Sequence, residues 1–318
     1  MLARLQRFIT LGLIAAAAAW AAWFLHRDAP GWAMVGALLI LLGYTLFLGL
    51  EFAMLWFVNR GDSAPSANFT QLAAAWWGEV TTAPQVFCWR QPFRPNAQPD
   101  FLPSDSGRRG VVFVHGFFCN RALWNPMMQR LRRLGVPFVA VDLEPVFGSI
   151  DHYADIIDKA VWRIQAATGA APVIVAHSMG GLATRAWLDK YAGDERVHRV
   201  ITIGTPHRGT FLGRFAHTDN TRQMKLGSPW QEQLSSREPA TRFKRFTCFY
   251  GHCDNIVFPA STATLPGADN RHIPGCAHVQ MAHQDEVFSE VLRWIGSAAS
   301  PAKAADRPGP PAAAGRTR

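Results

Sequence analysis

The chain has 318 residues, of which 49% are hydrophobic and 17% are charged, and its formal net charge is +9. It is too apolar for a typical soluble protein and too polar for a transporter with many spans, and its length allows one large domain or two ordinary ones. The basic residues are scattered, with small clusters such as RLRR at 130–133, and no nucleic-acid-binding motif accompanies them. We therefore expect no nucleic-acid partner, and an anionic membrane surface accounts equally well for the charge.

Two uncharged apolar runs stand near the N-terminus, at residues 8–25 and 32–50. As helices, each would be about 27–29 Å long, which is enough to cross the hydrocarbon core of a bilayer. The sequence therefore predicts a two-helix transmembrane hairpin over residues 1–60, with Glu51 near the interfacial end of the second helix. A cleaved signal peptide is the alternative for the first run, although large residues crowd the expected cleavage zone.

Arginines flank the two apolar runs, with Arg4 and Arg7 before the first run and Arg60 after the second. The positive-inside tendency then predicts both termini and the following domain on the cytoplasmic side of a bacterial inner membrane, with a periplasmic domain as the alternative. Five cysteines without a CxxC pair agree with reduced thiols in the cytoplasm. If the domain is periplasmic, Cys253 and Cys276 are the pair expected to be bridged.

Residues 61–104 are predicted to be a polar linker followed by a short helix and a strand near 85–90. From 105 to 297 the sequence predicts one α/β domain, because short runs rich in valine and isoleucine alternate with helical segments. Such alternation is typical of a mostly parallel sheet with helices on both faces. The expected strands are 111–116, 137–143, 172–178, 197–204 and 246–251, and the expected helices are 121–135, 153–169, 181–193 and 284–296. Residues 298–318, rich in Ala, Pro and Gly, are expected to be disordered.

The stretch VIVAHSMGG at 173–181 places Ser178 between an expected strand and an expected helix. A sharp elbow that exposes a serine hydroxyl requires small residues two positions before and after it, and Ala176 and Gly180 stand there. Alanine replaces the first glycine of the G-x-S-x-G pattern but keeps its small size. The pattern predicts Ser178 as a nucleophile, with a serine that only caps the helix as the alternative.

A nucleophilic serine needs an oxyanion hole, a base and an acid. The loop after the first expected strand offers the backbone N–H of Phe117, which would lie beside that of Met179. His115, just before it, is expected to be structural.

The chain order nucleophile, acid, base restricts the search for the other two groups to residues after the serine. Asp254 directly follows a strand and is the predicted acid, with Asp269 in reserve. His278 is the predicted base, whereas His283 is expected to be a solvated surface residue.

Four residues near these positions raise a different possibility, a metal site made of His252, Cys253, Cys276 and His278. Their side chains suit zinc, but their spacing matches no known structural zinc site. We therefore predict neither a metal nor a cofactor.

Four motifs together resemble the bacterial lipases and esterases of the α/β-hydrolase fold, over about residues 105–295. They are HGF at 115–117, AHSMGG at 176–181, GTPHRGT at 204–210 and GCAHVQM at 275–281. The small lipases of Bacillus also carry alanine before HSMGG. The resemblance implies an α/β-hydrolase fold in which 211–240 forms a lid or acyl-binding cap, with apolar side chains from Phe211, Leu212, Phe215, Met224 and Trp230. An ordinary loop packed on the core is the alternative for this stretch. The resemblance gives His207 no catalytic role.

These features predict a membrane-anchored serine hydrolase that cleaves carboxylic esters through Ser178, His278 and Asp254. Its expected partners are the bilayer and a lipid or acyl-ester substrate. A thioesterase or acyltransferase with the same triad is one alternative, and an inactive hydrolase-fold interaction module is another. The sequence does not determine acyl-chain length, head group or oligomeric state.

Overall fold

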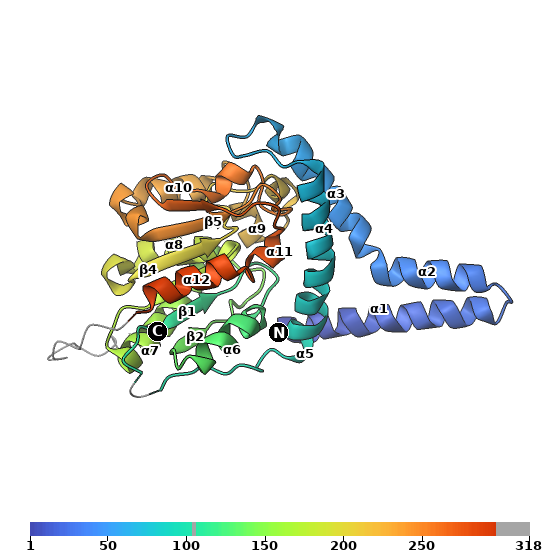
Figure 1. Cartoon of the computed structure of the whole chain (residues 1–318), viewed down its shortest axis with the longest axis horizontal. Coiled ribbons are helices and arrows are strands. Elements are labelled where there is room, and N and C mark those ends of the chain that lie inside the picture. The colour runs from blue at the N-terminus through green and yellow to red at the C-terminus, as the bar shows by residue number, and fades with distance from the viewer. Residues whose placement is uncertain (104–105, 297–318) are drawn as a thin grey trace, which may run out of the picture.

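A computed structural model describes residues 1–103 and 106–296 of the chain. Its C-terminal part is a layered α/β domain, from which two long N-terminal helices project (Figure 1). The tail over residues 298–318, for which we predicted disorder, lies outside the described residues.

One sheet of six parallel strands forms the centre of the domain, in the order β2-β1-β3-β4-β5-β6. The predicted parallel sheet is therefore confirmed. The strands are β1 (Val111–Val114), β2 (Phe138–Ala140), β3 (Val173–His177), β4 (Arg199–Ile203), β5 (Phe246–Tyr250) and β6 (Asp269–His272).

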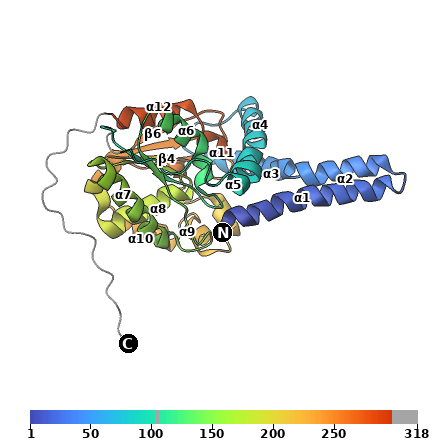
Figure 2. The ribbon, with the colours of Figure 1, turned by 90° about the horizontal axis from the view of Figure 1, so that it is seen from below.

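Successive strand residues alternate between two apolar cores, one on each face of the sheet. In β1, Val111 and Phe113 face one core, whereas Val112 and Val114 face the other. This two-residue period is what a sheet buried on both faces requires, and each such side chain contributes about 1.5–3 kcal/mol. Figure 2 shows α6 and α12 on one side and α7 and α8 on the other. These helices are α6 (Asn125–Arg133), α7 (Ala154–Thr168), α8 (Met179–Tyr191) and α12 (Asp285–Trp294).

The stretch between β4 and β5 contains short helices instead of an irregular loop. They are η6 (Phe211–Phe215), α9 (Asp219–Gln223), α10 (Pro229–Arg237) and η7 (Ala240–Arg245). Proline at the first position of α10 suits a helix start, and the Ser228 hydroxyl caps it by accepting the N–H of Gln231 at 3.3 Å.

The N-terminal helices α1 (Leu2–Leu25) and α2 (Pro30–Leu42) lie antiparallel and project from the domain (Figures 1 and 2). Gly36 allows their close approach, because a Cβ there would collide with the indole of Trp20. By length and composition, α1 is the one helix in the described residues that could cross a membrane by itself.

The second span predicted over 32–50 is not a single helix. Helix α2 ends at Leu42, and α3 (Tyr44–Val58) continues after a bend of 51°, so that a two-pass hairpin is not confirmed. Two residues explain the bend. Gly43 favours a kink, and the Thr45 hydroxyl donates to the carbonyl of Leu42 at 2.7 Å.

The predicted strand near 85–90 is wrong. Helix α4 (Phe69–Pro84) continues through a π-helical segment over Gln85–Arg90 into α5 (Gln91–Phe93). The apolar run that indicated a strand has one side chain, Val86, in the domain core, whereas Cys88 and Trp89 are exposed. A short apolar run does not distinguish helix from strand by its period alone.

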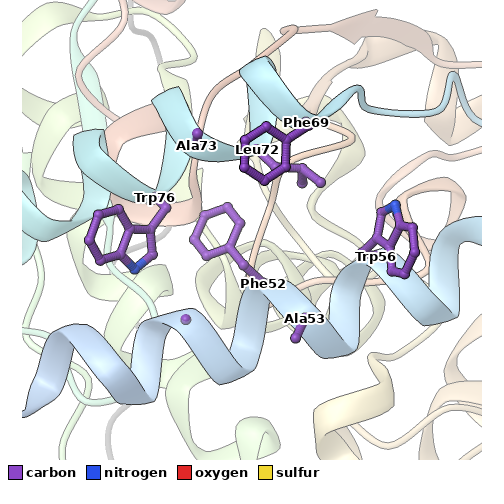
Figure 3. A pocket seen from close by; sticks show the side chains of 8 residues that line it. Phe52, Ala53, Trp56, Phe69, Leu72, Ala73 and Trp76 are labelled. Atoms are coloured by element: carbon purple, nitrogen blue, oxygen red, sulfur yellow. The ribbon is translucent and has the colours of Figure 1, made fainter.

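Helices α3 and α4 lie side by side against the domain. The hydroxyl of Tyr44 donates to the backbone carbonyl of Val80 at 2.8 Å, and the indole N–H of Trp76 donates to the backbone carbonyl of Thr45 at 3.1 Å. Between the two helices runs an apolar groove of about 620 Å³ (Figure 3). Its largest side chains are Phe52, Trp56, Phe69, Leu72 and Trp76.

Candidate active site

Ser178 lies on the turn between β3 and α8, with backbone angles φ 54° and ψ −128°. A positive φ costs a non-glycine residue about 1–3 kcal/mol and persists only where the surroundings impose it. Here the N–H of Ser178 donates to Ile203 at 2.8 Å, and its carbonyl accepts from Gly181 at 3.0 Å and from the hydroxyl of Thr205 at 2.9 Å. These bonds hold the serine at the carboxyl edge of the sheet, as the predicted elbow requires.

Glycines allow close approaches around this turn. A Cβ on Gly180 would lie 2.6 Å from the carbonyl oxygens of Val114 and His115, so that glycine lets α8 approach the end of β1. The neighbouring strand β1 therefore requires a small residue at 180. A Cβ on Gly116 would lie 2.8 Å from the Cβ of Ser178, which places the loop after β1 beside the serine.

His278 and Asp254 form a buried pair beside the same edge. The distance between Nδ1 of His278 and Oδ2 of Asp254 is 2.9 Å. Because an ionised carboxylate only accepts, the proton belongs on Nδ1. Oδ1 of Asp254 accepts the N–H of Ile256 at 3.0 Å and that of Val257 at 2.8 Å. Burial disfavours a positive charge on His278 and so lowers its pKa. The opposing effect of Asp254, with a smaller one of Glu79, is larger, so that the pKa of His278 is raised overall.

Ser178 and His278 line one cavity of about 560 Å³, together with Phe117. Asp254 is not among the lining residues and lies behind the imidazole. The stretch predicted to be a cap contributes Leu212, Phe215 and Met224 to the lining, and the N-terminal helices contribute Leu48, Glu51, Glu79 and Ala83, with Phe87 from the π-helical segment.

Two of the five apolar residues predicted for the cap do not line this cavity. The ring of Phe211 stacks on Phe258 with 5.7 Å between centroids, and the indole of Trp230 donates to Asp151 at 2.9 Å.

His115 and His207, for which we predicted no catalytic role, are both buried and hydrogen-bonded. His115 is buried and accepts the N–H of Leu143 at 3.0 Å through Nε2. His207 is also buried, with Nε2 3.1 Å from the hydroxyl of Thr202. Burial lowers the pKa of both imidazoles, which keeps them neutral.

Two further predicted positions lie away from the histidine–aspartate pair. Asp269, the reserve acid, begins β6 and forms an ion pair with Arg271 at 2.7 Å. The prediction that His283 is solvated is wrong, because its Nε2 lies 3.3 Å from the guanidinium of Arg90 in a partly buried position. Burial lowers the pKa of His283 to about 4.

The alternative metal cluster does not assemble. In residues 1–103 and 106–296, no three His, Cys, Asp or Glu side chains are grouped to hold a metal ion. Nε2 of His252 accepts the N–H of Gly275 at 3.2 Å, and its ring lies against His272 with 4.5 Å between centroids. Cys253 and Cys276 are free, buried thiols.

Sequence reasoning missed several buried polar residues around His278. The ring of His177 lies 4.5 Å from that of His278, and its Nε2 lies 3.1 Å from the His278 carbonyl oxygen. Asn255 accepts the N–H of His278 at 3.2 Å and donates to Glu51 at 2.7 Å. Glu51, expected at a membrane interface, is instead buried in the cavity wall. Adjacency to a predicted site residue was the only signal for His177 and Asn255, and nothing marked Glu79.

Comparison with known proteins agrees with this geometry at the level of the fold. Residues 110–234 match the family model described as alpha/beta hydrolase fold. The chain is similar to the mature Bacillus licheniformis lipase BlEst2, with 19% identity over 62% of this chain and 95% of that chain, at a TM-score of 0.53. It is also similar to Aspergillus fumigatus lipase B, with 18% identity over 62% of this chain and 56% of that chain, at a TM-score of 0.54. The domain therefore has the α/β-hydrolase fold.

Proposed function

We propose that the chain is a serine hydrolase that cleaves carboxylic esters, with Ser178 as nucleophile, His278 as base and Asp254 as its acid partner. The observation that carries this proposal is the shared cavity, which Ser178 and His278 line together, while the buried Asp254 holds the far side of the imidazole. A serine hydroxyl becomes nucleophilic beside a base that a third group orients. The similarity of the fold to two lipases supports the same reaction class.

The reaction follows from these positions. Oγ of Ser178 attacks the ester carbonyl, and its proton passes to Nε2 of His278. The backbone N–H groups of Phe117 and Met179 stabilise the tetrahedral oxyanion, one from the loop after β1 and one from the first turn of α8. His278 then protonates the leaving alcohol, and water, deprotonated by the same imidazole, releases the acyl group from the serine.

The cavity favours an acyl chain as the group bound beside the serine. Its volume of about 560 Å³ is typical of pockets that enclose a small organic ligand. Most of its wall is apolar, and its large apolar residues include Leu212, Phe215, Leu48 and Phe87. Removing the acyl chain from water would contribute about 0.8 kcal/mol for each buried methylene group.

We also propose that the N-terminal helices anchor the chain in a bilayer. Both α1 and α2 expose large apolar side chains along their length, including Phe8, Ile14, Trp32 and Leu39. Contiguous apolar surfaces of this kind mark membrane or protein contacts. At the outer end of α1 the guanidinium of Arg27 lies 4.3 Å from the ring of Trp23, a pair suited to a membrane interface.

The chain leaves the domain at Met1, whose amino group contacts Glu144 at 2.6 Å. After the α1–α2 pair it returns to the domain at α3, which packs against it. The base of the projecting pair therefore lies on the same side of the bilayer as the hydrolase domain. We propose the cytoplasmic side of a bacterial inner membrane, with the periplasmic side as the alternative.

Hydrolysis of p-nitrophenyl esters from acetyl to palmitoyl by the detergent-solubilised full chain tests the proposal. We expect Ser178→Ala and His278→Ala to lower kcat by at least about 10³-fold. The controls Ser236→Ala and His152→Ala, at exposed positions, should keep full activity. The chain-length optimum decides between esterase and lipase, and faster cleavage of matched thioesters would favour a thioesterase. A folded wild-type chain without activity would contradict the proposal and favour an interaction module.

A further inference from the structure

A carboxylate from the N-terminal helices holds the helix that carries the proposed base. Glu79 of α4 is buried, and its two oxygens accept the N–H of Val279 at 3.1 Å and the N–H of Gln280 at 3.2 Å. These are the two residues after His278 in α11 (His278–Met281). Gly78 allows this approach of α4, because a Cβ there would collide with the side chain of Gln280. The position of the imidazole therefore depends on a side chain 199 residues earlier in the chain.

A second carboxylate reaches the same histidine through an amide. Oε2 of Glu51, on α3, accepts from the amide nitrogen of Asn255 at 2.7 Å. The amide oxygen of Asn255 in turn accepts the backbone N–H of His278 at 3.2 Å. This fixes the orientation of the Asn255 amide, which follows Asp254 directly in the chain. Glu51 therefore contacts the acid loop and, through one residue, the base.

Burying two carboxylates is costly unless something compensates for it. Burial raises the pKa of Glu79 to about 6, against the opposing effects of His278 and the two N–H groups. The titratable groups that face His278 are the carboxylates of Asp254, Glu79 and Glu51 and the imidazole of His177. An imidazolium forms on His278 when Ser178 loses its proton, and negative charge beside it stabilises that state.

We propose that Glu79 and Glu51 are positioning residues for His278, so that the N-terminal helices complete the active site in addition to anchoring the chain. This inference rests on the proposed function. Glu79 fixes the backbone that carries the imidazole, and Glu51 fixes the amide of Asn255, which accepts the backbone N–H of His278. Both also supply negative charge toward the imidazolium.

The test compares Glu79→Gln, Glu51→Gln and Glu79→Asp with a matched control in the full chain in detergent. The control is Glu290→Gln, since Glu290 is also buried and accepts from Thr247 at 2.9 Å and from Arg271 at 2.8 Å. Thr247 lies in the amino-terminal half of β5, whereas Asp254 follows the carboxyl end of that strand. The measurements are kcat, KM, the pH profile of kcat/KM on p-nitrophenyl butyrate, and the melting temperature.

For Glu79→Gln we expect kcat to fall about 10- to 100-fold with KM nearly unchanged, because misplacement of a catalytic group by less than an ångström has effects of this size. The acid limb of the pH profile should move to lower pH in Glu79→Gln, because this variant removes a negative charge near the imidazole. It should move by less in Glu51→Gln, because burial raises the pKa of Glu51 to about 7 and leaves this carboxyl partly protonated at the limb. Glu79→Asp keeps the charge and should leave the acid limb in place. Glu290→Gln should lower the melting temperature without moving the limb.

The outcomes separate the inference from the function on which it rests. An active wild type whose acid limb stays in place in both glutamine variants would overturn the inference alone, because a purely structural contact changes only stability. If Glu79→Gln does not fold, Glu51→Gln decides, since Glu51 contacts only the Asn255 side chain in this loop. A folded wild type that neither hydrolyses the ester nor reacts with a fluorophosphonate would overturn the proposed function and the inference together.

Discussion

The carboxylate of Asp254 is held at both oxygens, with Oδ2 2.9 Å from Nδ1 of His278 and Oδ1 bound to the N–H groups of Ile256 and Val257. The backbone thus fixes the carboxylate before the imidazole meets it. An aspartate oriented in this way selects the tautomer of the histidine and leaves Nε2 free to accept a proton.

Asp254→Asn should therefore lower kcat by about 10⁴-fold, because an amide in this position favours the wrong imidazole tautomer. Asp269→Asn should keep nearly full activity, since Asp269 pairs with Arg271 at the edge of the sheet. Steady-state kinetics on one soluble ester distinguishes the two. Equal losses in both variants would show that the acid has been misassigned.

Gly204→Ala should abolish activity through a collision. Gly204 has φ 54°, and a Cβ there would lie 2.8 Å from Oδ2 of Asp254 and 3.0 Å from Nδ1 of His278. Gly227→Ala is the matched control, because Gly227 has φ 63° and the nearest neighbour of an added Cβ, Oε1 of Glu232, would lie 4.0 Å away. Both should lose about 1–2 kcal/mol of stability from the left-handed backbone. Only Gly204→Ala should lose kcat, and equal kcat values in the two variants would contradict the geometry.

The pH profile should show a limb set by His278. The base must be neutral to accept the proton of Ser178, so that kcat/KM falls as the pH drops through its pKa. Burial lowers that pKa, but Asp254, followed by Glu79 and Glu51, outweighs burial and raises it above 6.5. Activity measured from about pH 5 to about pH 9 should therefore fall toward low pH, with a midpoint above the ordinary histidine value of about 6.5. A midpoint below 6.5 would show that the carboxylates do not outweigh burial.

The reactivity of each cysteine toward alkylating reagents should depend on how far its thiol is buried. Burial raises the pKa of Cys119, Cys248 and Cys253 to about 12, and it also raises that of Cys276. Thiols react as thiolates, so that iodoacetamide at mildly alkaline pH should modify only Cys88, which is exposed. Peptide mapping of the native protein checks this. A bridge between Cys253 and Cys276 would contradict the free thiols and favour a periplasmic domain.

Membrane attachment should depend on the exposed faces of α1 and α2. Replacing the exposed Ile14 and Leu38 with Asp would cost about 3 kcal/mol at each position if both lie in hydrocarbon. The double variant should leave the membrane fraction in a carbonate wash, whereas the wild type stays. The matched control replaces Leu134 and Leu292, exposed on the domain, in the same way. Release of the wild type by carbonate would contradict anchoring.

Strands β1 to β5 and helices α6, α7, α8 and α12 follow from local patterns, because a strand such as β3 begins with a run of apolar residues and α7 ends just before Gly169, whose φ of 65° suits glycine. Strand β6 and the short helices between β4 and β5 were not predicted. The N-terminal segment was predicted less well. Its helices are apolar whether they meet lipid or protein, and composition does not separate the two cases. The bend at Gly43 and the contacts of α3 with α4 determine that α3 packs against the domain.

The proposed catalytic residues could be located because Ser178 and His278 stand within recognisable motifs, whereas Asp254 lies in the loop that follows a predicted strand. Glu79 and Glu51 could not, because their role depends on a tertiary contact between segments about 200 residues apart. Glu51 stands in an apolar run that resembles a membrane span, which led to its placement at an interface. Only the bend of 51° brings it to Asn255.

The most direct test of the account is the reaction of the full-length chain with a fluorophosphonate, followed by mass spectrometry of the labelled peptide. The account predicts a single adduct on Ser178, formed at a rate that falls sharply in His278→Ala and does not change in His152→Ala. An intact, folded chain that carries no adduct, or an adduct on another serine, would contradict the assignment of Ser178 as the nucleophile.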